Sequence, residues 1–227
     1  MLVSTLGEFG LIERIAQGIR CDSSKVIMGI GDDVAVLKFS AERYLLATCD
    51  IQVAGVHFLP EAIEPCQLGR KAVAINLSDI ASMGGTPEHL LVSLVLTPET
   101  SVEFVDGLYQ GIRRECEAAE VDIVGGNMAT SPSQMMVDIF LTGWVEPEHL
   151  LLRSGAEAGE LLLVTGQVGA SAAGLALLLE GDRGRVPQAE AKLRAAHLTP
   201  QARLREGRAI STSRWATNAA WAGSPAS

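Results

Sequence analysis

Apolar residues recur along the chain at the spacing of an amphipathic helix in three places. This spacing predicts helices over residues 7–20, 66–84 and 101–120. Pro65 suits the first position of the second helix, and Ser101 is a candidate cap for the third. We expect the middle helix to be buried over much of its surface, because its apolar residues are not confined to one narrow stripe.

Shorter runs rich in Val, Leu and Ile predict strands between these helices. The expected strands cover residues 26–39, 43–50, 89–97, 121–126 and 135–146. A polar turn at 40–42 joins the first two, which are therefore expected to be a hairpin or neighbouring strands. The alternation of strands and helices predicts an α/β fold, α+β layered, with mixed strand pairing.

The pattern changes after the polar, glycine-containing stretch at 153–160, where a second unit is expected to begin. Residues 161–181 predict a strand, a glycine turn and a helix packed through Ala and Gly. Helix-prone segments follow at 187–197 and 200–209. Residues 211–227 show no periodicity and contain no acidic residue, so they differ from everything before them.

Charge and cysteine content narrow the functional classes. The 227 residues include 18 Lys and Arg against 27 Asp and Glu, a formal net charge of −9, which argues against nucleic acid or an anionic membrane as the main partner. A chain this acidic needs metal ions to bind phosphates. The four cysteines are scattered, no secretory leader precedes Gly7, and no apolar run is long enough to span a bilayer. We therefore expect a cytoplasmic protein without a disulfide framework.

Aspartates at strand ends or beside glycines are the first candidates for chemistry. Asp32 and Asp33 lie in GIGDD, Asp50 follows a strand, and Asp79 lies inside an otherwise apolar helix. Mg²⁺ takes oxygen ligands and binds through a few carboxylates while sharing the oxygens of a phosphate. The alternative is that each is an ordinary turn, strand-end or surface residue. Asp79 fits that alternative least, because a buried charge needs a partner.

Glycine-rich stretches and two cationic side chains are the second candidates. GIGDD, VGGN at 124–127 and TGQVGAS at 165–171 allow the close approach of a phosphate, but each is also compatible with a tight turn. None matches a Walker or dinucleotide-binding fingerprint. His57 lies in a glycine-containing segment and faces either a ligand or its own loop. Arg153 is either a phosphate ligand or a surface residue.

Taken together, several strings resemble the thiamine-monophosphate kinase family, and they occur in the family's order over about residues 7–209. The strings are GEFGLI, GIGDDVAVL, TCDIQVAGVHF, KAVAINLSDIASMGGTP, IVGG, LLRSGAEAGE and VTGQVGASAAGL. The resemblance implies an aminoimidazole-ribonucleotide-synthetase-like fold. It predicts an N-terminal domain for ATP and Mg²⁺ binding and for dimerisation at 1–148, a partial C-terminal α/β domain at 149–210 and a non-matching tail at 211–227.

The resemblance also implies an activity, the ATP-dependent phosphorylation of thiamine monophosphate to thiamine diphosphate by a homodimer with several Mg²⁺ ions. In this chain the metal-coordinating positions of the family are Asp33, Thr48, Asp50 and Asp79. Cys49 stands where the family contributes a backbone or hydroxyl oxygen.

Three further residues match family positions for the two substrates. His57 matches a contact to thiamine phosphate, Gly126 lies at the nucleotide, and Arg153 matches an arginine on the ATP phosphates. Asp32 belongs to the motif but is a less certain ligand. Asn127 replaces an aspartate that binds metal in the family; it keeps an oxygen and loses a charge, which predicts weaker Mg²⁺ binding.

Nothing after Ile210 matches the remainder of the family's sequence, including an ISDGL-like stretch. We interpret residues 211–227 as the product of a frameshift or a truncated gene, and we expect little or no kinase activity. Two alternatives stay open. One is another ATP-dependent enzyme of the same fold, such as a selenophosphate synthetase, and the other is a non-catalytic nucleotide-binding remnant.

Overall fold

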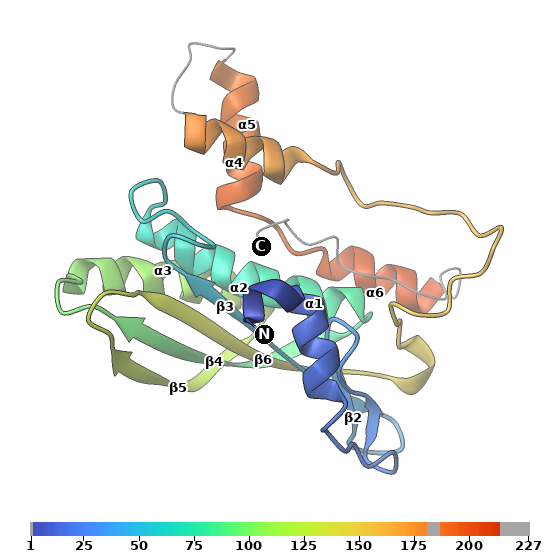
Figure 1. Cartoon of the computed structure of the whole chain (residues 1–227). Coiled ribbons are helices and arrows are strands. Elements are labelled where there is room, and N and C mark those ends of the chain that lie inside the picture. The colour runs from blue at the N-terminus through green and yellow to red at the C-terminus, as the bar shows by residue number, and fades with distance from the viewer. Residues whose placement is uncertain (1, 181–186, 214–227) are drawn as a thin grey trace.

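The computed structural model describes residues 2–180 and 187–213, and a six-stranded sheet forms its centre (Figure 1). The strand order is β1-β2-β3-β6-β4-β5; β4 and β5 are parallel, and the other neighbours are antiparallel. The strands are β1 Val26–Met28, β2 Ala35–Lys38, β3 Tyr44–Val53, β4 Thr86–Leu96, β5 Asp122–Thr130 and β6 Met136–Val145. The mixed pairing confirms the predicted α/β fold class.

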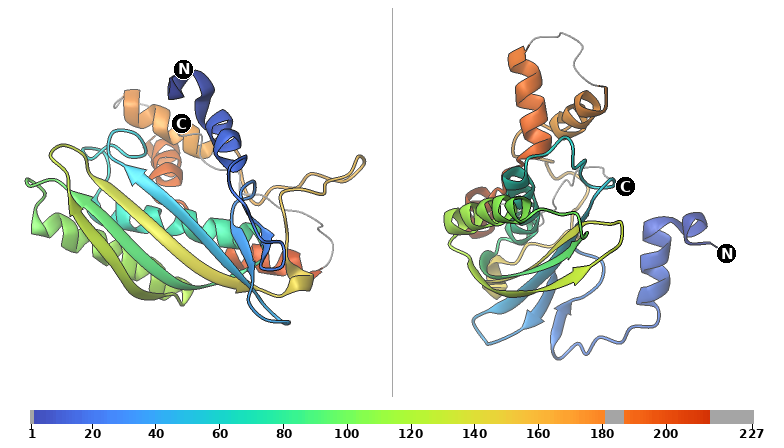
Figure 2. Two further views of the ribbon diagram at one scale, coloured as in Figure 1. Left: turned by 60° about the horizontal axis from the view of Figure 1, so that its bottom comes forward. Right: turned by 90° about the vertical axis from the view of Figure 1, so that its left-hand side faces the viewer.

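Two helices cover one face of this sheet and leave the other face open (Figure 2). The helices of the described residues as a whole are α1 Val3–Ala16, α2 Pro65–Ser82, α3 Val102–Ala119, η1 Pro147–His149, α4 Ala170–Glu180, α5 Pro187–Leu198 and α6 Leu204–Ser213. The covering pair is α2 and α3, while α4 and α5 pack on each other away from the sheet (Figure 1). The carboxylate-bearing faces of β3 and α2 therefore meet in the layer between sheet and helices.

Local signals explain why α2 and α3 begin where they do. Pro65 is the first residue of α2, and the backbone N–H of Glu64 donates to the side chain of Gln67 at 3.1 Å in a capping box. The backbone N–H of Phe104 donates to Oγ of Ser101 at 3.1 Å. Both predicted helix starts are confirmed.

Glycine allows α2 and α3 to pack at backbone contact. A Cβ at Gly69 of α2 would collide with the carbonyl of Leu108, and a Cβ at Gly111 of α3 would collide with the carbonyl of Cys66. The contact is reciprocal, so a side chain at either glycine would push the helices apart. This packing fixes the position of α2, which bears Asp79.

The core lies between the covered face of the sheet and these helices. Its large, fully buried side chains include Leu46, Leu90 and Ile139 from the sheet and Leu77 and Ile80 from α2. Alternate strand residues face the helices, as expected for a sheet with one buried face. The middle helix is buried over most of its surface, as the sequence predicts.

The open face of the sheet exposes large apolar side chains. Ile51 of β3 is 44% exposed, and Leu91 of β4 and Phe140 of β6 are each 37% exposed. Phe140 is directly opposite Leu91, so these side chains adjoin across neighbouring strands. An apolar sheet face of this kind is a feature of interaction surfaces.

The predicted strand at 26–39 is wrong in extent, because it is two short strands. β1 and β2 pair with each other antiparallel, and the GIGDD segment forms the turn between them. Gly31 within this turn has φ +127°, a conformation that favours glycine over other residues. The predicted pairing of this region with the next strand is confirmed by β2 and β3.

Two other expectations differ from the structure. Helix α1 has a kink at Gly7, and none of its residues is buried, although the helical spacing predicts a buried face. Residues 161–164 form no strand, and Leu162 is 96% exposed. In both places the apolar pattern is present, but no neighbouring element among the described residues covers it. The strand predicted at 121–126 runs through its glycines to Thr130.

The C-terminal part consists of α4, α5 and α6. A Cβ at Gly174 of α4 would collide with the carbonyl of Leu193 in α5, which confirms the expected packing of α4 through small residues. Helix α6 packs on α2 and extends to Ser213, so it crosses the predicted boundary at residue 210. Residues 214–227 of the predicted tail lie outside the described residues.

Arg208 anchors α6 to the sheet domain. Its guanidinium donates to Oε1 of Glu146 at 2.6 Å and to the carbonyl oxygen of Gly84 at 3.1 Å, and it lies 5.6 Å from the centre of the Trp144 ring. The Arg208 hydrogen bond lowers the pKa of Glu146 to about 2. Among the helices of the described residues, none is long and apolar enough to cross a membrane.

Candidate metal and phosphate site

Asp33 lies in the turn between β1 and β2, at the edge of the layer between sheet and helices. The neighbouring Asp32 accepts the backbone N–H of Asp33 at 2.9 Å, which stabilises the turn. The side chain of Asp33 is 6% exposed. The two adjacent aspartates thus differ in what they do: Asp32 stabilises the backbone of the turn, and the side chain of Asp33 is buried.

Thr48 and Asp79 extend the site from β3 and α2. Oγ1 of Thr48 donates to Oδ2 of Asp79 at 2.8 Å and lies 3.5 Å from the backbone oxygen of Asp33. Thr48 is 8% exposed and Asp79 is 6% exposed. Asp79 is therefore a buried carboxylate with a hydroxyl partner, as expected for a charge inside an apolar helix.

Ser82 is a member of this cluster that the sequence analysis missed. Its Oγ lies 3.1 Å from Oδ2 of Asp33 and 2.7 Å from the backbone oxygen of Asp79, so it connects the turn to α2. It follows Asp79 by three residues, which places the two on the same side of the helix. That spacing is the signal that could have identified it.

The three carboxylates of Asp33, Asp50 and Asp79 interact electrostatically. Burial raises the pKa of Asp79 to about 8, and repulsion from Asp50 and Asp33 adds to this effect. Burial also raises the pKa of Asp50, with further contributions from Asp138 and Asp33, while His57 opposes the shift. A cation would relieve this burial and repulsion.

Arg153 approaches the same carboxylates from the segment after η1. Its guanidinium donates to Oδ1 of Asp33, and its backbone N–H donates to Oδ2 of Asp32 at 3.0 Å. The guanidinium is about half exposed. Arg153 therefore neutralises one carboxylate of the cluster while about half of its side chain stays accessible to solvent.

The oxygen donors fit a hard divalent cation. Carboxylate and hydroxyl oxygens of Asp33, Thr48, Asp50 and Asp79 form the donor set that Mg²⁺ prefers. Within residues 2–180 and 187–213, however, no three His, Cys, Asp or Glu side chains form a group that encloses an ion. An ion here would need further oxygen ligands, which water or a phosphate can supply to Mg²⁺.

His57 lies in a tight loop after β3. Its backbone N–H donates to the carbonyl of Val53 at 2.9 Å, and its Nδ1 accepts the backbone N–H of Val53 at 3.1 Å. Gly55 has φ +76°, and its N–H donates to the carbonyl of Phe58 at 2.8 Å. The loop that carries His57 lies within electrostatic reach of Asp50.

Gly126 lies in the same row of the sheet as Asp50. Asp50 is opposite Ile139, Ile139 is opposite Val92, and Val92 is beside Gly126. Ile139 and Val92 are buried, so this row faces the helices. A Cβ at Gly126 would collide with the carbonyl of Val92, which explains the glycine. Three strand spacings, about 14 Å in total, separate Gly126 from Asp50.

The side chains of Cys49 and Asn127 point to the open face of the sheet. Cys49 is opposite the exposed Phe140, and Asn127 lies in the row of Ser93 and Asp138. Partial burial raises the pKa of the Cys49 thiol, and Asp138 adds to this effect. The structure therefore does not bring these two side chains together with Thr48 and Asp79. Only the backbone of Cys49 adjoins the cluster.

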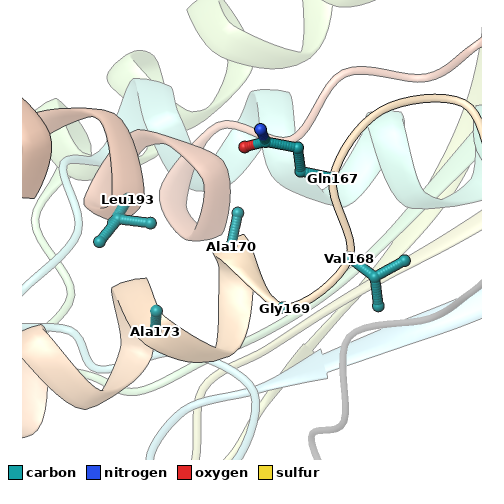
Figure 3. A pocket seen from close by; sticks show the side chains of 6 residues that line it. All are labelled: Gln167, Val168, Gly169, Ala170, Ala173 and Leu193. Atoms are coloured by element: carbon teal, nitrogen blue, oxygen red, sulfur yellow. The ribbon is translucent and has the colours of Figure 1, made fainter.

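The TGQVGAS turn forms a separate hollow before α4 (Figure 3). Its volume is about 470 Å³, and it is lined by Gln167, Val168, Gly169, Ala170, Ala173 and Leu193. None of these residues is charged. The structure brings no carboxylate to this hollow, and the tight-turn interpretation of this glycine stretch describes it best.

Comparison with known proteins gives three findings. Residues 31–145 match the family described as AIR synthase related protein, N-terminal domain. The chain is 39% identical to the thiamine-monophosphate kinase of Aquifex aeolicus (strain VF5) over 204 residues, and 37% identical to that of Escherichia coli (strain K12) over 208 residues. Each alignment covers 90% of this chain, but only 63% and 62% of the relatives, so the chain spans less than two thirds of their length.

Solved structures give the same result. A structure described as AaThiL complexed with AMPPCP and TMP has a TM-score of 0.85 and 35% identity, and the match covers 96% of this chain and 66% of that one. The crystal structure of thiamine monophosphate kinase from Aquifex aeolicus has a TM-score of 0.80 and 36% identity, with 96% and 68% covered.

Proposed function

The chain belongs to the AIR synthase related family and, within it, to the thiamine-monophosphate kinases, and from this premise we propose that it phosphorylates thiamine monophosphate with ATP. The observation that supports the proposal is the convergence of Asp33, Asp50 and Asp79 between sheet and helices, with Arg153 beside them. Such a cluster of carboxylates binds polyphosphate through metal ions. A structural relative is described as complexed with AMPPCP and TMP.

Mg²⁺ is the cofactor that the donor set supports. Asp33, Thr48, Asp50 and Asp79 would hold it through carboxylate and hydroxyl oxygens. When bound, Mg²⁺ neutralises the charge of the phosphates during transfer. The raised pKa of Asp79 supports this assignment, because a buried carboxylate among like charges is unfavourable without a cation.

The chain's own residues have positioning roles in this reaction. To bind the phosphates of ATP, Arg153 releases the carboxylate of Asp33 and donates to a phosphate oxygen instead. A guanidinium forms strong hydrogen bonds with carboxylates and with phosphates. His57 contacts the phosphate of thiamine monophosphate. An oxygen of that phosphate attacks the γ-phosphorus of ATP in line, the bond to the β-phosphate oxygen breaks, and ADP leaves. No covalent intermediate with the chain is needed.

Gly126 is proposed to bind the nucleotide at the far end of the site, together with the backbone of Asn127, whose side chain points to the open face of the sheet. They are separated from Asp50 by about three strand spacings, or roughly 14 Å, so they act on another part of an extended nucleotide. Asn127 offers an amide oxygen where relatives of the resembled family offer a carboxylate. Because this side chain lies on the other face of the sheet from the carboxylates, its missing charge acts on bound MgATP only over a distance, and we propose that the chain binds Mg²⁺ and ATP slightly more weakly than an aspartate-containing form would.

The open face of the sheet supports a homodimer. Ile51, Leu91 and Phe140 expose apolar side chains over three adjacent strands, and no described element of the chain covers them. A second copy of the same face would bury these side chains from water. The proposed domain of 1–148 would thus contain the carboxylates of the site and the dimer contact, while Arg153 lies just beyond it.

The thiols support a reducing compartment. Cys21, Cys49, Cys66 and Cys116 are all free, and Cys21 and Cys49 are exposed. Free exposed thiols persist where glutathione and thioredoxin keep them reduced. We propose that the protein works in the cytoplasm.

Asn127 favours one alternative function, a nucleotide-binding protein without turnover, because it stands where the resembled family has an aspartate that binds metal. One experiment decides between the functions. Mg²⁺-dependent ATP binding is measured by calorimetry, and ADP formation is measured with thiamine monophosphate, selenide or formylglycinamidine ribonucleotide as the second substrate. ADP formation that depends on thiamine monophosphate supports the kinase. ATP binding without turnover supports the alternative, and failure to bind ATP refutes both.

A further inference from the structure

Lys71 of α2 is a buried lysine without an anionic partner. It is 7% exposed, and within residues 2–180 and 187–213 it forms no ion pair. Its Nζ donates instead to the backbone carbonyl of His57 at 3.0 Å. Burial lowers the pKa of Lys71 to about 8. A buried ammonium group bound to a carbonyl is unfavourable for stability alone, so its contact with His57 needs an explanation.

The peptide that Lys71 holds belongs to the loop that orients the His57 ring. Nδ1 of the ring accepts the backbone N–H of Val53 at 3.1 Å, so its lone pair is engaged and the ring proton resides on Nε2. The backbone N–H of His57 donates to the carbonyl of Val53 at 2.9 Å. With Lys71 on the carbonyl, the residue is fixed through its N–H, its ring and its C=O.

The surroundings of Lys71 explain why it acts on the loop. Lys71, His57 and His197 all line a cavity of about 160 Å³ that is formed by the loop, α2 and the α4–α5 pair. His197 is 5% exposed, its Nδ1 lies 3.1 Å from Oγ of Ser171, and burial lowers its pKa to about 4, with Lys71 adding to the effect. The cationic partner that faces His197 is thus Lys71, and the remaining lining is mainly apolar.

We propose that Lys71 is a positioning residue, which fixes the His57 carbonyl so that the Nε2–H of His57 is presented to the phosphate of thiamine monophosphate. This inference rests on the proposed function, in which His57 contacts the acceptor. Lys71 then acts indirectly, through the loop. Its loss should lower the affinity for thiamine monophosphate and leave the affinity for the nucleotide unchanged.

The test compares Lys71→Met with the control Lys38→Met, an exposed lysine at the end of β2. Amide hydrogen exchange at Gly55 and His57 reports on the loop without any ligand, and calorimetry measures thiamine monophosphate and MgATP separately. In Lys71→Met we expect faster exchange at both amides. We also expect the affinity for thiamine monophosphate to fall about tenfold, which corresponds to the loss of one charge-assisted hydrogen bond. The affinity for MgATP should not change. Lys38→Met should match the wild type.

A double-mutant cycle with His57→Ala separates positioning from direct contact. If Lys71 acts through His57, Lys71→Met adds nothing to the loss that His57→Ala causes. Additive losses, or unchanged exchange in Lys71→Met, overturn the proposal. If Lys71→Met does not fold, Lys71→Gln is tested instead, because its shorter amide stays polar but does not reach the carbonyl. Absence of thiamine monophosphate binding in the wild type refutes the proposed function, and the exchange result then decides the positioning role independently.

Discussion

Oγ1 of Thr48 donates a 2.8 Å hydrogen bond to Oδ2 of Asp79, which connects the middle of β3 to α2. Both residues are buried. Arg153 is the one cation among the groups of the described residues that shift the pKa of Asp79. The hydroxyl alone leaves much of the cost of the buried charge uncompensated. The fold therefore holds Asp79 in an electrostatically unfavourable position, which is a feature of binding sites.

Asp79→Asn should separate stability from binding. The amide oxygen keeps the contact with Thr48, and the charge is removed, so repulsion from Asp50 and Asp33 disappears. In the absence of Mg²⁺ we expect the free energy of unfolding to rise by about 1 kcal/mol or more. Mg²⁺-dependent ATP binding should fall at least about tenfold, since a metal ligand is lost. Urea titration and calorimetry measure the two effects.

The matched control for Asp79→Asn is Asp106→Asn, in α3, which lies outside the site. Neither stability nor ATP binding should change beyond a few tenths of a kcal/mol, as for most surface substitutions. If Asp79→Asn lowers stability and leaves ATP binding intact, Asp79 is a structural hydrogen-bonding residue and not a metal ligand.

Asn127→Asp should strengthen binding of the metal–nucleotide complex. A unit charge pair at about 4 Å is worth roughly 4 kcal/mol at an effective dielectric near 20. Asn127 is exposed and its side chain points away from the carboxylates, so distance and hydration remove most of this energy, and we expect a gain of at most about threefold in affinity for MgATP. Ala129→Asp is the control, because it adds the same charge two residues further along the exposed strand. Equal gains in both variants would mean that the effect is not specific to position 127.

The sequence predicted α2 and α3 well because their signals are local. Pro65, Ser101 and a helical apolar spacing determine where a helix begins whatever packs on it. The strand expected at 161–164 failed because a strand needs a pairing neighbour, and periodicity contains no information on that. The same reason explains α1, whose apolar face has nothing to cover it among the described residues.

Much of the candidate site could also be predicted from the sequence. Aspartates at strand ends and beside glycines meet where the elements converge, and Asp33, Asp50 and Asp79 do lie within electrostatic reach of one another, as expected from the sequence. The face on which a strand residue points depends on register, which is a property of the folded sheet. For that reason the separation of Cys49 and Asn127 from the carboxylates emerges only from the structure.

His197 should make a destabilising contribution in mild acid. Burial lowers its pKa from 6.5 to about 4, so the unfolded chain binds a proton below pH 6.5 that the folded chain does not bind until about pH 4. Stability is thus unaffected above pH 6.5 and is lost as pH decreases toward 4. Between pH 7 and pH 5 we expect His197 to contribute a loss of about 2 kcal/mol in the free energy of unfolding, measured as the difference between the wild type and His197→Gln, because the raised pKa of Asp79 makes the protein more stable over the same range. Urea titrations at both values measure it.

His197→Gln should abolish this part of the pH dependence, while His89→Gln, which replaces a half-exposed histidine, should preserve it. Since His197 lies in α5 against Ser171 of α4, the loss in acid should also appear as faster amide exchange in these two helices. An unchanged pH profile in His197→Gln would assign the acid sensitivity to other groups.

Phe140→Asp should dissociate the proposed homodimer. Phe140 is 37% exposed in the single chain, faces Leu91 across β6 and β4, and lies near the centre of the open apolar face. A carboxylate there would be buried against apolar side chains of the second copy, so we expect the dimer dissociation constant to rise by about a hundredfold or more. Phe39→Asp is the matched control, because Phe39 is 76% exposed just beyond β2 and outside the sheet. Sedimentation equilibrium measures both variants. A wild-type chain that sediments as a monomer, or a dimer that tolerates Phe140→Asp as well as Phe39→Asp, would place any self-association elsewhere.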